Sequence, residues 1–320
     1  MLDELLEGLR RHPGLTRKAV VGLWASRFFS KEEWTAGGVG ADAGAVPVPG
    51  GYLLVSAEGI FPELLADPGF AGLCAVTVAV NDIYAVGGRP LGIVAVVFAG
   101  DIDADDRERF LDGFEDGLAH YGIQMLGGHT SPEAGLPSIS VAAVGYATAL
   151  IRGPSPRPGD RLLLVCDLEG TAHLDLFAWD AVTGHPPERT RTMLEVLPRL
   201  AEEGVRVVCR DISNPGILGT CAMMLEPFAA GARVDLDAVP VPPGVTLDWW
   251  LAAHPSFGFI LAAPPEVATC AREAFAAAGA SCTEVGETTP GTMITVTLGD
   301  ERADFMDVAG WPVTGLGRGR

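Results

Sequence analysis

The sequence predicts two domains built from layers of helices and strands, of the α+β or α/β class. Segments with helical spacing of apolar residues alternate with short apolar runs in both halves of the 320 residues. At ~100–200 residues per domain, this length suits two domains. The stretch from Arg152 to Asp160 has three prolines in nine residues, which is typical of a domain boundary. We therefore expect an N-terminal helical extension over 1–38 and domains over 39–151 and 152–320.

The first half is expected to contain three helical segments and three strands. Leu5, Leu6 and Leu9 form an apolar stripe in the first helical segment. A second, Ala-rich segment runs from Pro68 to Val86 and stops at two glycines. The full set of expected elements in this half comprises helices within 2–29, 68–86 and 103–121 and strands over 51–57, 90–100 and 138–149.

The second half repeats the alternation of strands and helices. Its strands are apolar runs bounded by glycine, proline or charged residues, and its helices are longer and richer in alanine or leucine. The expected strands cover 161–168, 205–212, 256–263 and 292–298, and the expected helices cover 187–204, 218–230 and 265–279. Periodicity does not order these strands within a sheet.

The charge balance excludes several classes of function. The chain has 22 Lys and Arg against 41 Asp and Glu, a formal net charge of −19, which repels phosphate backbones and disfavours nucleic-acid binding. Its two lysines, Lys18 and Lys31, do not follow a glycine, so a P-loop is excluded. The 48% apolar content is ordinary for a chain that buries a core.

No membrane partner or export is expected. The N-terminus is charged and lacks the apolar core of a signal peptide. The longest uncharged stretch, Trp249 to Pro265, is too short and too rich in Pro and Gly for a membrane span of ~20 apolar residues. The six cysteines form no C-x-x-C pair and mostly lie in apolar runs, which favours buried reduced thiols in a cytoplasmic protein over disulfides or a zinc site.

Acidic and amide side chains occur where the local pattern predicts apolar or turn residues. Asp82 interrupts an apolar helix, so it must be paired, bound to a metal or exposed in a cleft, because an unpaired buried charge costs several kcal/mol. Each acid also has an ordinary structural explanation when it is considered singly. Asp82 could pair with an arginine or face solvent, Asp42 could be a turn residue, and Asp211 could cap the N-terminus of a helix. Oxygen side chains that end elements beside glycines together favour Mg²⁺. The candidates of this kind are Asp42, Ser56, Glu58, Asn81, Asp82, Asp211, Ser213 and Asn214.

The segment GGHT, residues 127–130, is expected to be a loop between a helix and a strand. Its two glycines would allow a ligand to approach the backbone closely. His129 would contact phosphate or metal there, with an ordinary surface histidine as the alternative. GVGADA is not preceded by a predicted strand and is discounted as a dinucleotide fingerprint. G-x-S-x-G and H-E-x-x-H are absent from the sequence.

The stretch VAVNDIYAVGGRPLG, residues 78–92, resembles the NDI-A-GA-P segment of the AIR-synthase-like (PurM-like) superfamily. This superfamily includes aminoimidazole ribonucleotide synthetase, thiamine-monophosphate kinase, selenophosphate synthetase and a hydrogenase maturation protein. Other segments match its motifs in chain order: GADAGAV (GDDAAV), LLVSAEG (TTD), GGHT (GGDT or GGHS), LIRGPSPRPGD (an arginine-containing link), RDISNPGILG (DISDGL) and TEVGETTPG (an IGE-type turn). The resemblance covers Val39 to Gly291.

The resemblance implies an α+β, two-domain fold whose N-terminal domain forms a shared barrel-like sheet in a homodimer. It also implies ATP in the cleft, with Mg²⁺ bridging acids to phosphates. The metal ligands that carry over are Asp42, Glu58, Asp82 and Asp211, and Ser56 would assist them. The residues that carry over toward the nucleotide phosphates are Asn81, Gly128, Arg152 and Ser213. The chemistry agrees, since carboxylates bring Mg²⁺ to a triphosphate and an arginine neutralises transferring charge.

The sequence also departs from the family motifs. Ala41 and Asn214 stand where the GDD and DISD patterns have Asp, Ala57 replaces a Thr, and His129 replaces the Asp of GGDT. Fewer carboxylates imply fewer metal ions or weaker binding of them. The first cysteine, Cys74, falls in a predicted helix, and the sequence ends GLGRGR, so the cysteine chemistries of selenophosphate synthetase and the hydrogenase protein are not expected. The resemblance then points to AIR-synthase-related proteins with no assigned activity.

Two hypotheses of function follow. The first is an ATP- and Mg-dependent kinase or synthetase that activates a small molecule by phosphoryl transfer, with His129 as the candidate general base. The second is a dimeric nucleotide-binding or scaffold protein with reduced or no activity, which the substituted acids favour. The acceptor pocket is expected near Trp249, Trp250 and Phe257, with the core as the alternative place for these aromatic residues.

Overall fold

The computed structural model describes residues 1–28, 40–132, 135–151, 155–255 and 258–316. The chain folds into two compact units that do not follow its linear order. Unit 1 comprises Met1–Ala41, Ile151–Ala181 and Gly204–Arg320, and unit 2 comprises Asp42–Leu150 and Val182–Glu203. The N-terminal residues thus group with the C-terminal half, and one segment of the second half groups with the first.

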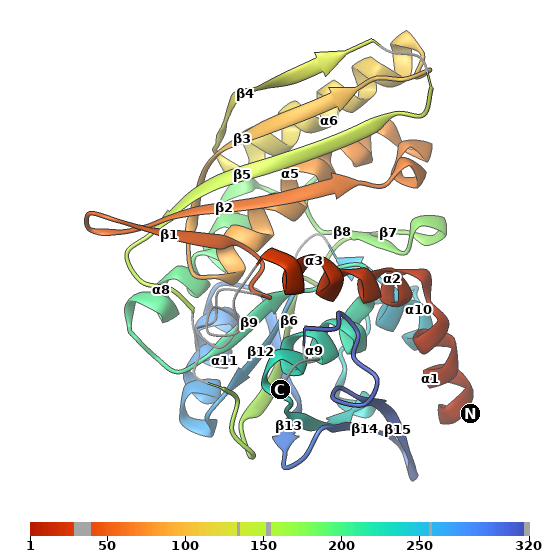
Figure 1. Ribbon diagram of the computed structural model, residues 1–320, viewed down its shortest axis with the longest axis vertical. Helices are drawn as coiled ribbons and strands as arrows, with labels where there is room; N and C mark the ends of the chain where they lie inside the picture. The colour runs from red at the N-terminus through yellow and green to blue at the C-terminus, as the bar shows by residue number, and fades with distance from the viewer. Residues whose placement is uncertain (29–39, 133–134, 152–154, 256–257, 317–320) are drawn as a thin grey trace. The chain divides into compact units, whose positions relative to one another are not determined.

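Unit 2 is built on a five-stranded sheet (Figure 1). Its strands, in spatial order, are β1 (Gly44–Val48), β2 (Gly51–Ile60), β5 (Ser138–Ala147), β3 (Arg89–Phe98) and β4 (Gln124–Ser131). Only β3 and β4 pair in parallel among these, because helix α6 (Ala104–Tyr121) connects them. The other neighbours pair antiparallel.

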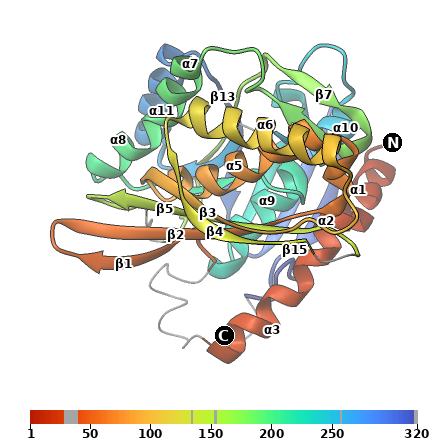
Figure 2. The ribbon, with the colours of Figure 1, turned by 90° about the horizontal axis from the view of Figure 1, so that it is seen from above.

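Helices α5 (Pro68–Ala85) and α6 cover one face of this sheet (Figure 2). Asp67 and Asp103 cap them, each accepting a hydrogen bond from a backbone N–H three residues later. Gly122, with φ 66°, ends α6 in the left-handed conformation that glycine adopts without strain. The sequence therefore sets the ends of both helices locally.

Two glycines let α5 and α6 approach each other closely. A Cβ at Gly72 of α5 would collide with the carbonyl oxygen of Phe110, and one at Gly113 of α6 would collide with that of Gly69. Most of α5 is consequently buried between α6 and the sheet. Helix α5 is also long and apolar enough to cross a membrane, the one such helix among the described residues, but 89% of it is buried in the fold.

The segment 182–203 adds helices α7 (Pro187–Leu194) and α8 (Val196–Glu202) to unit 2. Arg89 at the start of β3 pairs with Glu195 at 2.5 Å and with Glu202 at 2.6 Å. His120 of α6 lies 2.8 Å from the Thr190 hydroxyl, and both residues are buried. These contacts attach the segment to elements far from it in the sequence.

Unit 1 is built on a seven-stranded sheet. In spatial order its strands are β15 (Glu301–Asp307), β14 (Met293–Leu298), β10 (Gly231–Asp235), β13 (Ser281–Thr289), β6 (Arg161–Cys166), β12 (Gly258–Ala263) and β9 (Val208–Asp211). Every residue of β12 is buried, so both faces of the sheet are covered. Alternate residues of β6, such as Leu162 and Leu164, join a core with α9 (Gly216–Leu225), α10 (Leu247–Ala252) and α1 (Leu2–Arg11).

Several smaller elements complete unit 1. Strands β11 (His254–Pro255), β8 (Ala178–Asp180) and β7 (Thr171–His173) pair with one another in a separate three-stranded sheet. Helix α11 (Pro265–Ala277) contacts β6, β12 and β13. The N-terminal chain continues through α2 (Pro13–Thr16), η1 (Arg17–Val20) and α3 (Val21–Phe28), and the remaining short 3-10 helices are η2 (Pro62–Ala66), η3 (Leu174–Leu176), η4 (Glu226–Phe228) and η5 (Leu236–Ala238).

The predicted helices at 68–86, 103–121 and 265–279 are confirmed to within two residues. Two predictions are wrong: GGHT is not a loop but part of strand β4, and TEVGETT lies in strand β13 rather than in a turn. Glycines in both segments permit a bulge, and such a break in the strand pattern resembles a loop in the sequence. The six cysteines form no disulfide, as expected, but Cys270 is exposed.

Replacing Gly72 with Ala should destabilise unit 2 by about 1–3 kcal/mol, because the added methyl group forces α5 away from α6. Gly8→Ala is the matched control: Gly8 lies within α1 and a Cβ there meets no atom within 4 Å. That change should raise stability by up to about 1 kcal/mol. Urea unfolding of both variants measures the difference, and equal effects would refute the close packing of the two helices.

Stability should also depend on His254. Burial, with smaller contributions from His12 and Lys18, lowers the pKa of His254 to about 4 from its ordinary 6.5. Between these two values the unfolded chain takes up a proton that the folded chain does not, so stability falls as the pH falls. This one group contributes a slope of at most about 1.4 kcal/mol per pH unit. In His254→Gln, urea unfolding between pH 7 and pH 4.5 should show a shallower decline than in the native chain, and an unchanged decline would contradict this assignment.

Candidate metal and nucleotide site

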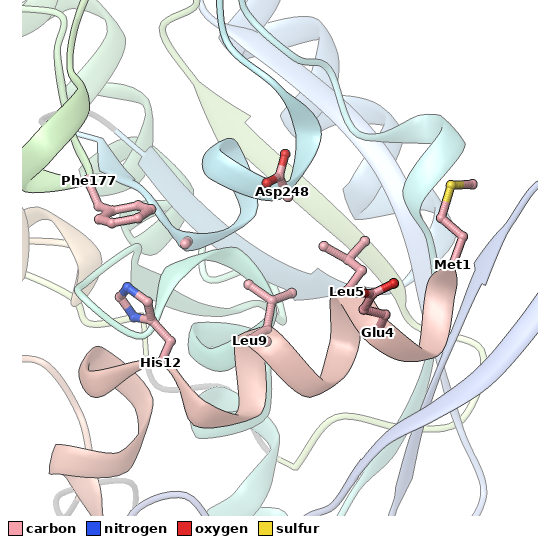
Figure 3. A pocket seen from close by; sticks show the side chains of 9 residues that line it. Met1, Glu4, Leu5, Leu9, His12, Phe177 and Asp248 are labelled. Atoms are coloured by element: carbon pink, nitrogen blue, oxygen red, sulfur yellow. The ribbon is translucent and has the colours of Figure 1, made fainter.

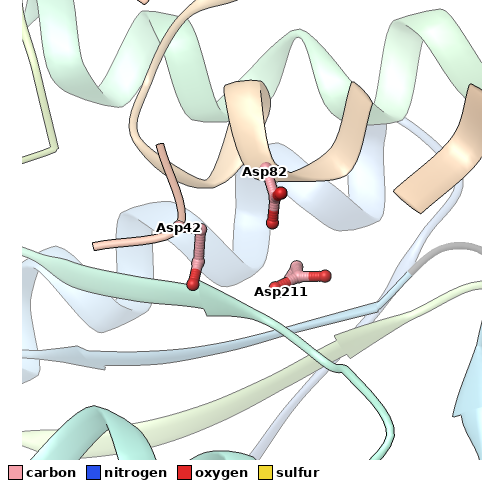
Figure 4. Close-up of side chains that lie close together, drawn as sticks. All are labelled: Asp42, Asp82 and Asp211. Carbon is pink, nitrogen blue, oxygen red and sulfur yellow. The ribbon is translucent and has the colours of Figure 1, made fainter. Parts of the chain in front are cut away.

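Two carboxylates of unit 2 lie close together. Asp42 precedes β1, Asp82 belongs to α5, and their carboxylate oxygens lie within 4.8 Å of each other (Figure 4). Asp82 is 4% exposed and Asp42 is half-buried. Two like charges at this separation in a partly desolvated place favour a cation between them, and paired carboxylate oxygens are the donors that Mg²⁺ prefers.

The C-terminal end of α5 makes a negative charge on Asp82 still less favourable. Asp82 lies in the last turn of the helix, where the backbone carbonyls give the helix end a partial negative charge. The helix ends three residues later, at Ala85, and Gly87, with φ 84°, forms the turn that leads into β3. The helix dipole therefore disfavours a negative charge on Asp82. A bound cation would offset both this effect and the repulsion between the Asp42 and Asp82 carboxylates.

Ser56 and Glu58 lie on β2, on the side of the sheet that faces α5. The Ser56 hydroxyl is buried and donates a hydrogen bond to the carbonyl oxygen of Ala79 at 2.9 Å. Glu58 is exposed and, within the described part of the chain, does not join the group of acids that contains Asp42 and Asp82. Asn81, beside Asp82 on α5, is 3% exposed. The Ser56 hydrogen bond thus joins β2 to α5, the helix that carries Asn81 and Asp82.

Gly128 and His129 lie on the exposed strand β4. A Cβ at Gly128 would collide with the carbonyl oxygen of Ala95 on the neighbouring strand, so pairing with β3 is what requires this glycine. The His129 ring lies 5.9 Å from the ring of Phe98. Its imidazole is exposed to solvent.

The remaining predicted residues belong to unit 1. Asp211 is the last residue of β9 and is 8% exposed, and Ser213 follows it in the turn before α9. The Ser213 N–H donates to the Thr220 hydroxyl at 3.3 Å. Arg152 lies outside the described residues.

Arg210 is a residue that sequence reasoning missed. Its guanidinium donates to the carbonyl oxygen of Gly40 at 2.7 Å, a contact within unit 1 that links β9 to the chain just before Asp42. Its only signal in the sequence is its place beside Asp211.

Comparison with known families assigns both halves of the chain. A model described as "AIR synthase related protein, N-terminal domain" matches residues 40–147, and the corresponding C-terminal domain matches residues 157–299. The chain belongs to the AIR synthase related family. The predicted membership of the PurM-like superfamily is thereby confirmed.

Several curated proteins are relatives of this family member, and the share of their own length that it spans differs widely. An uncharacterized protein of Synechocystis sp. is 35% identical over 99% of both chains. A selenide, water dikinase of Nitratidesulfovibrio vulgaris is 28% identical over 77% of this chain and 68% of its own. Phosphoribosylformylglycinamidine synthase subunit PurL of Halobacterium salinarum is 27% identical over 84% of this chain, which spans 42% of that protein.

Solved structures share the fold of this family member. Thermotoga maritima PurL complexed with ADP has a TM-score of 0.71 and 21% identity, covering 99% of this chain and 54% of that one. AaThiL complexed with AMPPCP and TMP has a TM-score of 0.65 and 15% identity, covering 90% and 96% of the two chains. At these identities the likeness shows the α+β fold, and both relatives hold an adenine nucleotide in their structures.

Proposed function

We propose that this AIR synthase related protein is an ATP- and Mg-dependent enzyme that activates a small-molecule acceptor by phosphoryl transfer. The observation that carries the proposal is the pair of carboxylates from Asp42 and Asp82, one of them buried at the end of a helix. Family relatives complexed with ADP or AMPPCP support the nucleotide. The carboxylate oxygens suit a hard divalent cation, which in such a site brings the triphosphate to the protein.

Further ligands are proposed from the family motifs. By the resemblance of RDISNPGILG to the family's DISDGL motif, Asp211 would be a further metal ligand. Glu58 is the fourth metal ligand proposed from these motifs. The residues proposed to approach the phosphates are Asn81, Gly128, Arg152 and Ser213, with Ser56 in a supporting role.

The chain's own residues would do the following in catalysis. Bound Mg²⁺ supplies charge neutralisation at the phosphates. Arg152 would neutralise charge on the transferring group, and Asn81 and the Ser213 hydroxyl would orient the nucleotide. His129 is the proposed general base, since its imidazole is exposed to solvent on β4 and could be reached by an acceptor.

The second candidate function is a nucleotide-binding scaffold without turnover. The observation that favours it is the loss of oxygen ligands beside the site, with Ala41 next to Asp42 and Asn214 in the turn after Asp211. Binding of ATP that does not need Mg²⁺, together with no release of ADP over hours in the presence of candidate amines and amides, would support the scaffold over the enzyme.

Asp82→Asn tests the metal site. Removing one charge from the pair should weaken Mg-dependent ATP binding by at least ~10-fold, while the melting temperature stays the same or rises because the two carboxylates no longer repel each other. Calorimetric titration of ATP with and without MgCl₂ measures the effect. Asp112→Asn, on the exposed side of α6, is the control for charge. If Asp82→Asn bound Mg·ATP like the native chain, the assignment would fail.

We also propose that the chain is a homodimer that pairs through the open face of the unit 2 sheet. Side chains on β2 alternate: Leu54 and Ser56 are buried on the α5 side, whereas Leu53 and Val55 are 37% and 42% exposed on the other. Cross-strand neighbours extend this apolar face, since Val46 lies opposite Leu53. An exposed apolar sheet face of this kind is typical of a protein–protein interface.

Val55→Glu should convert the dimer to monomer, with a dimer dissociation constant raised by more than ~100-fold, because the two-fold axis buries the new charge twice. Leu111→Glu, at a 49% exposed position on α6, is the matched control and should leave the dimer intact. Sedimentation velocity distinguishes the two states. A native chain that sediments as a monomer at micromolar concentration would refute the proposal.

A further inference from the structure

Unit 1 contains a cavity of about 420 Å³ that lies among residues with no proposed role in nucleotide or metal binding (Figure 3). One wall is helix α1, which contributes Leu5 and Leu9. Helix α1 lies outside the residues 40–147 and 157–299 that match the family models. The volume is within the ~300–1,000 Å³ range of small-molecule sites.

An aromatic group forms another part of the wall. The Phe177 ring lines the cavity, meets the His12 ring edge-on at 5.2 Å and stacks on the Trp249 ring at 6.2 Å. The Trp249 indole N–H donates to the carbonyl oxygen of Leu174, and the His254 backbone N–H donates to that of Phe177. Phe177 is held in the left-handed region at φ 48°, which is strained for a non-glycine residue. The fold thus maintains this ring in place at a cost in backbone energy.

The charges that line the cavity are negative. Glu4 and Asp248 both line it, and its lining, all of it described, contains no Lys or Arg. The amino group of Met1 is directed to Glu301 at 3.5 Å. His12 accepts a hydrogen bond from the Gly14 N–H through Nδ1, and burial together with Arg17 lowers the pKa of its imidazole, so it is neutral at pH 7. An apolar cavity with two carboxylates and an aromatic ring is complementary to an organic cation.

We propose that this cavity binds an organic ammonium ion with an apolar body. The ammonium group is recognised by the carboxylates of Glu4 and Asp248, and its alkyl chain packs on Leu5 and Leu9 toward the Phe177 ring (Figure 3). The lining of this cavity shares no residue with the proposed ATP site. Trp249 supports the site from behind Phe177, which gives a role to one of the aromatic residues that the sequence singled out.

The test uses the full chain and hexylammonium chloride, with hexanol and sodium hexanoate as neutral and anionic probes of the same length. Calorimetric titration should show saturable binding of one hexylammonium per chain, at least ~10-fold tighter than hexanol, and no binding of hexanoate. A binding order in which hexanol or hexanoate equals hexylammonium, or no saturable binding of hexylammonium, overturns the proposal.

Variants then place the bound cation. The double change Glu4→Gln and Asp248→Asn should weaken hexylammonium binding by more than ~10-fold, whereas Glu108→Gln with Asp112→Asn, an equal charge change on the exposed side of α6, should not. Phe177→Gly should also weaken it, and it should fold, because glycine adopts a positive φ without strain. Native affinity in either cavity variant, with an unchanged melting temperature, would place the cation elsewhere and refute the site.

Discussion

A carboxylate in the last turn of a buried helix is the constraint on which the candidate site depends. Helix α5 is enclosed by the sheet of unit 2 on one side and by α6 on the other, and glycines at the contact let the two helix backbones approach closely. Asp82 is therefore desolvated, faces the negative end of its own helix and lies beside Asp42. Each of these effects disfavours charge on Asp82, and the proposed cation would offset them.

The same sheet carries the exposed apolar face on which the proposed dimer depends. Its helix-covered face is filled by α5 and α6, while its other face leaves Leu53 and Val55 in water. Successive side chains of a strand point to opposite faces, and in β2 apolar side chains occur on both: Leu54 on the helix-covered face, Leu53 and Val55 on the open one. An ordinary antiparallel sheet has a polar outer face instead. The apolar residues of β2 thus have two consequences: those on one face pack against α5, and those on the other face remain exposed.

Unit 1 includes residues outside the ranges that match the family models, and these residues pack in its core. Leu2, Leu6 and Leu9 of α1 belong to the same core as α9 and the seven-stranded sheet. Because α1 uses this face for packing, its neighbouring residues Glu4 and Leu5 are left to line the cavity with Phe177. The N-terminal extension therefore both completes a core and builds a wall that the family models do not contain.

Local signals were sufficient for much of the fold. The caps and glycine stops of α5 and α6, the apolar strands and the order of the family motifs are all readable along the chain, because each depends on residues close together in sequence. β4 was mistaken for a loop because its glycines serve pairing with β3, a contact made across a long crossover. The grouping of segment 182–203 with unit 2 likewise depends on Arg89, about a hundred residues earlier, pairing with Glu195.

The sequence by itself determined that an acidic chain with an NDIYAVGGRP motif carries oxygen-bearing side chains near the ends of its elements. Only the tertiary structure decided that Asp82 is buried beside Asp42 while Glu58 stays exposed, and that α1, Phe177 and Asp248 line one open cavity. The reason is that spacing along a chain defines which face of an element a side chain occupies, whereas desolvation and distance depend on what packs against that face.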